Sequence, residues 1–205
     1  MKQTGNVAGN YFDKYHSKNP ISRYLVENFL KNFDSFTHSE HKGSVYELGC
    51  GEGVLSWRLQ RQGWKVTASD VDSDIIQKAR KNAAAGETGG PTFEVRSIYD
   101  LEEGFLSGYD LVVCCEVLEH LPNPLEALES LHRSGCRHLV CSVPREPLWR
   151  MMNMARGKYL RDWGNTPGHL NHWSSRGFAK LVSTCFSIER IGQPIPWTFI
   201  RAIRP

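Results

Sequence analysis

The chain has 205 residues, of which 40% are hydrophobic and 23% charged, and a formal net charge of +3. This length suits one domain, 1–205, and the small net charge does not by itself require a nucleic-acid partner. The N-terminal segment lacks the apolar core of a signal peptide, and no apolar run reaches the roughly 20 residues of a membrane span. The six scattered cysteines form no C-x-x-C pair. We therefore expect a cytoplasmic protein with free thiols.

Strand-like apolar runs and helical patterns alternate along the chain. A helix is expected at 20–33, inside an N-terminal helical cap of residues 1–42. Strands are expected at 43–49, 64–70, 92–96, 109–115, 137–144, 186–192 and 197–205. Helices are expected at 54–63, 73–85, 124–133 and 174–185. The segment 145–173 fits no simple strand–helix step and is rich in Met, Trp and Arg.

The alternation predicts an α/β fold with a mostly parallel sheet. Seven strands are expected, with helices on both faces of the sheet as in Rossmann-like folds. A short Pro-containing loop joins the last two strands, which indicates a hairpin and hence one antiparallel strand. The segment 145–173 is then expected to be a lid that is inserted after the fifth strand and lies beside the substrate.

A glycine-rich loop joins the first strand to its helix in VYELGCGEGVLSWRL. Gly49, Gly51 and Gly53 allow a sharp turn and a close approach to a ligand at a helix N-terminus. A dinucleotide loop of the G-x-G-x-x-G type would need glycine at position 54, where the chain has Val54, so an NAD-linked dehydrogenase is disfavoured. Glu47, two residues before the loop, would repel a pyrophosphate and attract a cationic amino-acid ligand.

Asp70 ends the second predicted strand, seventeen residues after Gly53. A carboxylate at this place accepts hydrogen bonds from ribose hydroxyls in nucleotide-binding α/β folds. The glycine turn, the strand and Asp70 together therefore predict a nucleoside-containing ligand more strongly than the glycines alone.

The stretch CCEVLEHLPNP crowds two carboxylates and an imidazole directly after the fourth strand. Glu116, Glu119 and His120 are spaced i, i+3 and i+4, so in a helical turn all three point to one face. Pro122 and Pro124 limit such a helix to about one turn. Carboxylate and imidazole ligands suit a divalent metal ion. The alternatives are a metal-free acid–base group, a pocket wall and a solvated helix start.

Three stretches resemble, in order and spacing, the motifs of class I S-adenosylmethionine-dependent methyltransferases: ELGCGEG, ASDVDSDIIQKAR and YDLVVCCEVLEHLPNP, within residues 45–143. The resemblance implies S-adenosylmethionine as the cofactor, with the glycines beneath its methionine and ribose and Asp70 on the ribose. Many members carry an Asp where this chain has Ser97. The cofactor residues implied by the resemblance are Glu47, Gly49, Gly51, Gly53, Asp70, Val71, Ser97, Ile98 and Glu116, with Tyr15 closing the pocket from the N-terminal cap.

Two groups of methyltransferases carry the pattern Glu-x-x-Glu-His and use it to bind a divalent metal beside the methyl donor. Ubiquinone-biosynthesis O-methyltransferases continue with P-x-P, as this chain does, and small-RNA 2′-O-methyltransferases have a later His four places before a Trp, which His169 matches. The metal ligands implied by the resemblance are Glu116, Glu119, His120 and His169, with Mg or Mn as the ion. The candidate catalytic residues are Glu119, His120 and His169, because a histidine here can take the proton of a hydroxyl. Other methyltransferases carry only Leu-Glu-His without metal, so a metal-free pocket stays open.

Basic and apolar residues interleave in PLWRMMNMARGKYLRDW, inside the expected lid. Such a face docks on a membrane surface, accepts a lipid chain, or packs on the core with its basic residues in solvent; RNA is a weaker candidate. We therefore predict an S-adenosylmethionine-dependent methyltransferase that acts on a hydroxyl of a small or lipid-linked molecule. An RNA 2′-O-methyltransferase and a non-catalytic cofactor-binding partner subunit are the alternatives.

Overall fold

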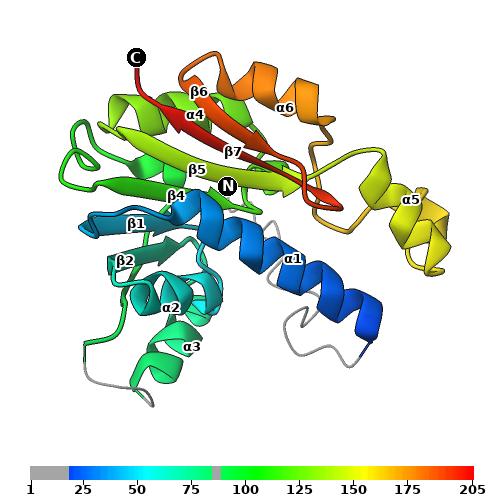
Figure 1. Ribbon diagram of the computed structural model, residues 1–205, viewed down its shortest axis with the longest axis horizontal. Helices are drawn as coiled ribbons and strands as arrows, with labels where there is room; N and C mark the ends of the chain where they lie inside the picture. Colours follow the sequence, from blue (N-terminus) through cyan, green and yellow to red (C-terminus); the bar gives the residue numbers. More distant parts are fainter. Residues whose placement is uncertain (1–18, 85–88) are drawn as a thin grey trace, which may run out of the picture.

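A seven-stranded sheet in the order β3-β2-β1-β4-β5-β7-β6 forms the centre of the protein in a computed structural model that describes residues 19–84 and 89–205 (Figure 1). The strands are β1 Ser44–Leu48, β2 Lys65–Asp70, β3 Thr92–Val95, β4 Leu111–Cys115, β5 His138–Pro144, β6 Ser187–Gly192 and β7 Trp197–Ile203. Neighbouring strands are parallel except for β7, which is antiparallel to both β5 and β6. The predicted mostly parallel sheet with one antiparallel strand is confirmed.

The helices connect these strands and cover both faces of the sheet. They are α1 Pro20–Thr37, α2 Val54–Arg61, α3 Ser73–Ala84, α4 Pro124–Arg133, α5 Leu148–Ala155 and α6 Ser175–Val182, with short 3₁₀ helices η1 Ile98–Asp100, η2 Leu118–His120 and η3 Leu160–Asp162. One apolar core joins α1, α2 and α3 to the sheet, and a second core joins α4 and α6 to its other face. Helices therefore cover both faces, as the sequence predicts.

Helix α1 packs lengthwise on the sheet and carries the N-terminal part of the described chain into the first core (Figure 1). The Asn19 side chain caps it by accepting hydrogen bonds from the backbone N–H groups of Ile21 and Ser22. Phe29, Phe33 and Phe36 recur at helical spacing and are at most 2% exposed. This apolar stripe continues past residue 33, which is why the helix is longer than the predicted 20–33.

The carboxyl ends of the parallel strands lie together at one edge of the sheet. The glycine loop follows β1, Asp70 ends β2, Ser97 follows β3 and Glu116 follows β4. The predicted insertion after β5 carries α5 and η3, and α5 extends beyond this edge of the sheet (Figure 1). Ligands of open α/β sheets bind at such an edge where the strand order reverses, here between β1 and β4.

All six cysteines are free and five of them are buried, in agreement with their interpretation as apolar core thiols. None of the helices within the described residues is long and apolar enough to span a membrane.

Candidate functional site

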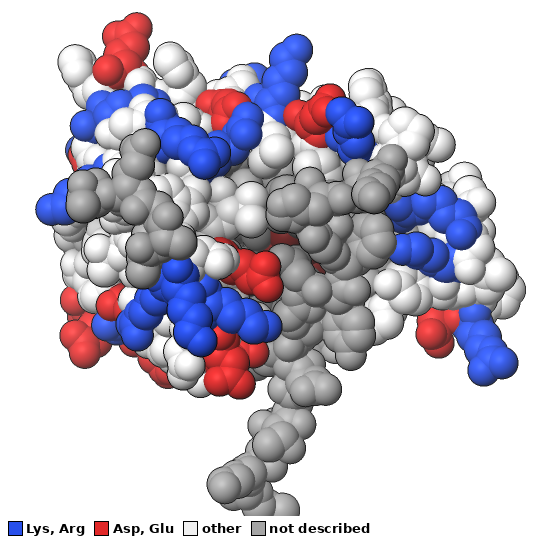
Figure 2. Space-filling model, turned by 90° about the horizontal axis from the view of Figure 1, so that it is seen from below, with Lys and Arg blue, Asp and Glu red and all other residues white. Residues whose placement is uncertain are grey.

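A cavity of about 550 Å³ opens at the carboxyl edge of the sheet, within the usual range of ligand pockets. The loops after β1, β2, β3 and β4, the inner side of α1 and the segment 145–173 line it. Figure 2 shows acidic side chains near the middle of the face seen from below, with basic side chains at the left, at the right and along the upper edge. The cavity thus brings together motifs that lie far apart in the sequence.

The glycine loop adopts a backbone that other residues rarely take. Gly49, Gly51 and Gly53 have φ angles of 70°, 53° and 86°, in the left-handed region that favours glycine. A Cβ on Gly49 would lie 2.3 Å from Cγ2 of Val117, in the turn after β4. The loop therefore packs directly against the turn that leads to Glu119, so the two halves of the cavity are in contact.

Asp70 fastens the glycine loop to the end of β2. Its Oδ2 accepts a hydrogen bond from the Gly51 N–H at 3.0 Å, and its Oδ1 accepts one from the Asp72 N–H at 3.1 Å. The carboxylate also lines the cavity. Asp70 consequently orders the loop in addition to the ribose contact that the resemblance implies.

Glu47 is a buried carboxyl group at the base of the cavity, only 2% exposed. Burial raises its pKa to about 8, against the opposing effect of a hydrogen bond from Ser56 Oγ. The group is therefore largely protonated at pH 7 in the empty protein. An ammonium group that enters the cavity would lower the pKa of Glu47, so that the carboxyl group would lose its proton.

Three residues that the sequence assigns to the adenine side of the cofactor lie in the wall of the cavity. Val71, Ser97 and Ile98 all line it, and Val71 is 48% exposed while Ile98 is 5% exposed. Ser97 caps η1, because its Oγ accepts a hydrogen bond from the Tyr99 N–H at 3.1 Å. Tyr15, the predicted closing residue, lies outside the described residues.

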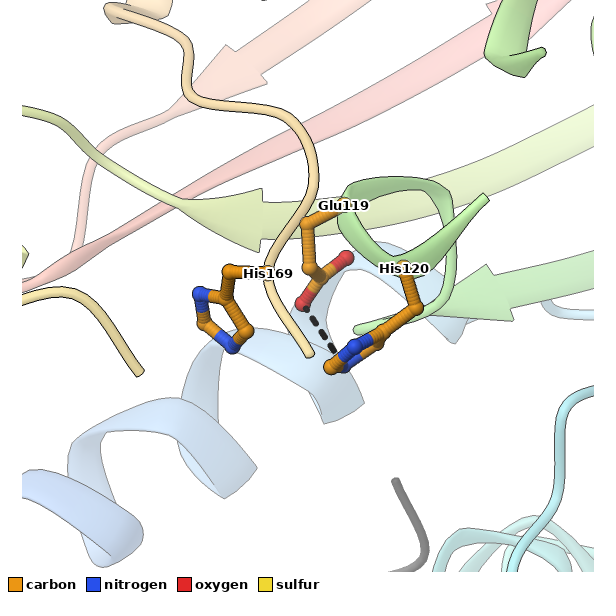
Figure 3. Close-up of side chains that lie close together, drawn as sticks. All are labelled: Glu119, His120 and His169. Carbon is orange, nitrogen blue, oxygen red and sulfur yellow. Dashed lines mark ion pairs between the residues drawn. The ribbon is translucent and has the colours of Figure 1, made fainter. Parts of the chain in front are cut away.

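Glu119, His120 and His169 converge beside the cavity (Figure 3). Glu119 and His120 come from η2, and His169 comes from the loop before α6. One ligand atom from each residue can be chosen so that all three lie within 4.8 Å of one another. Glu119 and His169 are buried, with exposed fractions of 1% and 8%. The structure thus brings together three of the four residues that were predicted to bind a metal ion.

The hydrogen bond of His120 fixes its tautomer. Nδ1 lies 2.9 Å from the carbonyl oxygen of Gly168, and since a carbonyl can only accept, Nδ1 carries the hydrogen. In a neutral imidazole Nε2 then carries the lone pair, and this atom lies 3.9 Å from Oε1 of Glu119. Histidines that bind metals or act as bases are commonly oriented by such a bond to a main-chain carbonyl.

Main-chain and side-chain contacts hold the His169 loop against η2. The carbonyl oxygen of Glu119 accepts hydrogen bonds from the backbone N–H groups of Leu170 and Asn171 at 2.8 and 3.0 Å. Asn171 also donates through Nδ2 to the Leu121 carbonyl at 2.6 Å. Sequence reasoning missed Asn171, because its hydrogen-bond partner lies 50 residues away in the sequence and no local pattern indicates the contact.

Two tryptophans, also missed from the sequence, line the cavity next to the Glu119–His120–His169 cluster. Trp149 stacks on the His169 ring with centroids 6.0 Å apart, and its Nε1 donates to Thr166 Oγ1 at 2.9 Å. Trp197 lies 5.7 Å from Trp149, centroid to centroid. Both indoles line the cavity, so an apolar, flat surface faces the cluster.

The geometry does not bring Glu116 into the predicted metal set. Its carboxylate accepts hydrogen bonds from Ser142 Oγ at 3.2 Å and from Trp197 Nε1 at 2.7 Å. Glu116 has φ 59° and η2 begins only at Leu118, so the continuous helical turn assumed for i and i+3 does not exist. Glu116 lines the cavity, where its predicted cofactor role stays a prediction.

The donor set of the cluster fits a divalent ion. Mg²⁺ binds ligands at about 2.1 Å, so ligand atoms on opposite sides of one ion are about 4.2 Å apart, and a separation of up to 4.8 Å needs only a small closure of the cluster. One carboxylate and two imidazoles also suit Mn, Fe or Zn. His172 is not in the group; its Nε2 lies 2.6 Å from Asn165 Oδ1.

The sequence model of the family described as "Methyltransferase domain" matches residues 16–184, which is most of the chain. The chain belongs to the methyltransferase domain family. The chain is 40% identical to the ubiquinone biosynthesis O-methyltransferase of Photorhabdus laumondii over 120 residues, 57% of this chain and 49% of that protein. It is 31% identical over 150 residues to the protein of the same name from Xanthomonas euvesicatoria, 71% of this chain and 58% of that protein. The chain spans about half the length of these curated relatives.

Solved structures confirm the fold of the chain. The magnesium protoporphyrin IX methyltransferase of Synechocystis with bound S-adenosylhomocysteine has a TM-score of 0.69 at 22% identity, covering 92% of this chain and 89% of that chain. The methyltransferase domain of bacterial CtHen1-C has a TM-score of 0.67 at 21% identity, covering 88% and 98%. The predicted membership of the class I methyltransferases is confirmed.

Proposed function

We propose that this protein transfers a methyl group from S-adenosylmethionine to a hydroxyl group of a small or lipid-linked molecule, assisted by a divalent ion. The observation that carries the proposal is the Glu119–His120–His169 cluster, placed beside the cavity that holds the glycine loop and Asp70. The curated relatives, named ubiquinone biosynthesis O-methyltransferases, support a hydroxyl acceptor.

The chemistry requires little beyond orientation of two reactants. When bound, S-adenosylmethionine supplies an activated methyl group, so that the new C–O bond forms as the C–S bond breaks and S-adenosylhomocysteine leaves. The acidic glycine-loop side of the cavity favours the cationic donor, and the packing of Gly49 on Val117 keeps the donor loop close to the acceptor turn. Fixing the acceptor oxygen in line with the methyl group supplies most of the acceleration.

The cluster activates the acceptor hydroxyl. A divalent ion such as Mg or Mn, held by Glu119, His120 and His169, would lower the pKa of that hydroxyl. In its absence the lone pair on His120 Nε2 would take the hydroxyl proton, with Glu119 stabilising the imidazolium. Nε2 cannot serve both as a ligand and as the base, so a dependence of turnover on metal separates the two roles.

The outer surface of the segment 145–173 supports a lipid-linked acceptor reached at a membrane surface. Met151, Leu160 and Trp163 are 57%, 60% and 75% exposed, and Arg150 and Arg161 are their basic neighbours. Exposed apolar side chains flanked by cations suit the interface of a bilayer that contains anionic lipid. The segment would then act as the predicted lid beside the substrate.

The deciding experiment is calorimetric titration of metal-stripped protein with S-adenosylhomocysteine and separately with Mn, followed by methyl-transfer assays on catechol. We expect S-adenosylhomocysteine to bind without metal, Mn to bind near one per chain, and turnover to need Mn. Glu119→Gln should abolish Mn binding and turnover while S-adenosylhomocysteine still binds. The control Glu129→Gln changes an exposed carboxylate on α4 and should leave all three unchanged. Normal turnover by Glu119→Gln would contradict the proposal.

A further inference from the structure

Both histidines of the cluster are held by one β-turn of the chain. The His169 N–H donates to the Thr166 carbonyl at 3.1 Å, which closes the turn. Pro167 stands at its second position and Gly168, with φ 87°, at its third, as is typical of a type II turn. The Gly168 carbonyl accepts the hydrogen bond from His120 Nδ1 at 2.9 Å. The place of this turn therefore determines where both imidazoles lie.

The Thr166 hydroxyl joins the start of the turn to helix α5. Its Oγ1 lies 2.9 Å from Trp149 Nε1 and 3.1 Å from Asn153 Nδ2. An indole N–H and an amide NH₂ can only donate, so Thr166 Oγ1 accepts both hydrogen bonds and both of its acceptor positions are filled. Trp149 and Asn153 are spaced i and i+4 on α5, so one face of the helix holds the hydroxyl.

The amide of Asn153 has a fixed orientation. The residue is 2% exposed, its Nδ2 also donates to the Gly164 carbonyl at 2.9 Å, and its Oδ1 accepts from Arg156 Nη2 at 2.7 Å. A carbonyl only accepts and a guanidinium only donates, so these two partners decide which end of the amide faces Thr166. Gly164 itself lies against α5, because a Cβ on it would be 2.3 Å from the Arg150 carbonyl oxygen. The turn is therefore anchored to a buried group that cannot be reversed without losing its partners.

The indole of Trp149 connects this anchor to the ring of His169. The two rings lie 27° from parallel with centroids 6.0 Å apart, and the His169 ring meets the His120 ring edge-on at 4.9 Å. Trp149 also lies 5.7 Å from Trp197, centroid to centroid. Because the hydrogen bond to Thr166 fixes the plane of the indole, it also fixes the surface against which the His169 ring lies.

We infer that Thr166 is a positioning residue, which acts through Trp149 and through its own turn to align the imidazoles of His120 and His169 with the acceptor hydroxyl. Its part is alignment, and the chemistry belongs to the two histidines. The effect on turnover rests on the proposed function, whereas the alignment is measurable in the free protein. A misplacement of about 1 Å costs up to about a hundredfold in rate, so the loss of one anchoring hydroxyl should be measurable.

Nuclear magnetic resonance on the metal-free and cofactor-free protein tests the alignment. The chain has six tryptophans and eight histidines, and the signals lost in Trp149→Phe and in His169→Gln identify the Trp149 indole N–H and the His169 ring. Thr166→Val replaces the hydroxyl by a methyl group of similar size. It should move the Trp149 N–H signal upfield, speed the exchange of that hydrogen with water and shift the His169 ring signal. Thr166→Ser retains the hydroxyl and should leave both signals near their wild-type positions.

Methylation of catechol tests what the alignment contributes to the reaction. Under identical conditions Thr166→Val should lower kcat about tenfold, while KM for S-adenosylmethionine changes by less than about twofold. This ratio has the same meaning whether the cluster acts with a metal ion or as a base. Trp149→Phe combined with Thr166→Val should be no slower than the slower single variant, because both remove the same hydrogen bond. Thr184→Val is the matched control, since it removes an exposed hydroxyl that does not line the cavity, and it should change neither the signals nor the rate.

Four outcomes separate this inference from the proposed function. Unchanged Trp149 and His169 signals in Thr166→Val would overturn the inference, and so would a wild-type kcat in that variant. A loss of kcat in Thr166→Ser as large as in Thr166→Val would also overturn it. The expected signal changes, together with no methyl transfer to catechol by the wild-type protein, would refute the proposed function and leave the alignment of the histidines by Thr166 standing.

Discussion

Protonation of Glu47 makes the stability of the empty protein depend on pH in a direction unusual for a carboxylate. Its pKa is about 8 in the folded protein, compared with an ordinary value near 4.3 in an unfolded chain. Between these values the folded state holds a proton that the unfolded state has lost. The contribution to stability is therefore complete below about pH 4 and is lost as the pH rises through about 8, at roughly 1.4 kcal/mol per pH unit.

The substitution Glu47→Gln removes this titration while retaining a polar group beside Ser56. Between pH 5 and pH 7 the wild-type free energy of unfolding should fall by about 3 kcal/mol relative to that of Glu47→Gln. Urea denaturation of the cofactor-free proteins at pH 5, 6, 7 and 8 measures the difference. The free energy of unfolding of Glu52→Gln, at a partly exposed position of the same loop, should change with pH in parallel with that of the wild type. A constant difference between wild type and Glu47→Gln across this range would refute the reasoning.

Three further substitutions test the loop, the ribose contact and the membrane-facing surface. Gly49→Ala should destabilise the fold by about 2–4 kcal/mol in urea, because it combines a left-handed φ with a Cβ 2.3 Å from Val117 Cγ2. Asp70→Ala should weaken S-adenosylhomocysteine binding at least roughly tenfold in calorimetry, since it loses both the predicted ribose contact and the bond from the Gly51 N–H. Trp163→Ala should lower co-sedimentation with phosphatidylglycerol vesicles and leave catechol methylation unchanged, because Trp163 is 75% exposed and does not line the cavity.

The regular elements could be predicted because their sequence periods agree with their burial. All five residues of β4 and six of the seven in β5 are buried, as continuous apolar runs in a central parallel sheet require. The segment 145–173 could not be predicted in this way. Helix α5 and η3 are organised by the buried amide of Asn153 and by Tyr159 and Trp163 at φ 55° and 50°, conformations that local rules do not assign to aromatic residues.

The candidate site could be predicted as far as its motifs reach. Glu119, His120 and His169 come together as the Glu-His pair and the later His indicate. The structure does not group Glu116 with them, because the spacing argument assumed one continuous helical turn, whereas Glu116 has a left-handed φ of 59° and η2 begins only at Leu118. Hydrogen bonds to β5 and β7 stabilise this left-handed residue. Partners that lie so far away in the sequence cannot be inferred from the residues next to Glu116.

The strained backbone at Glu116 helps to position the loops around the site. A non-glycine residue held at positive φ costs about 1–2 kcal/mol and persists only where its surroundings fix it. Here Ser142 on β5 and Trp197 on β7 fix the side chain of Glu116, and the turn that follows places Val117 against Gly49. The same turn sends the Glu119 carbonyl to the loop that carries His169. The glycine loop, η2 and the loop that carries His169 thus all meet at the turn that begins at Glu116, so a change in the contacts of Glu116 should disturb all three together.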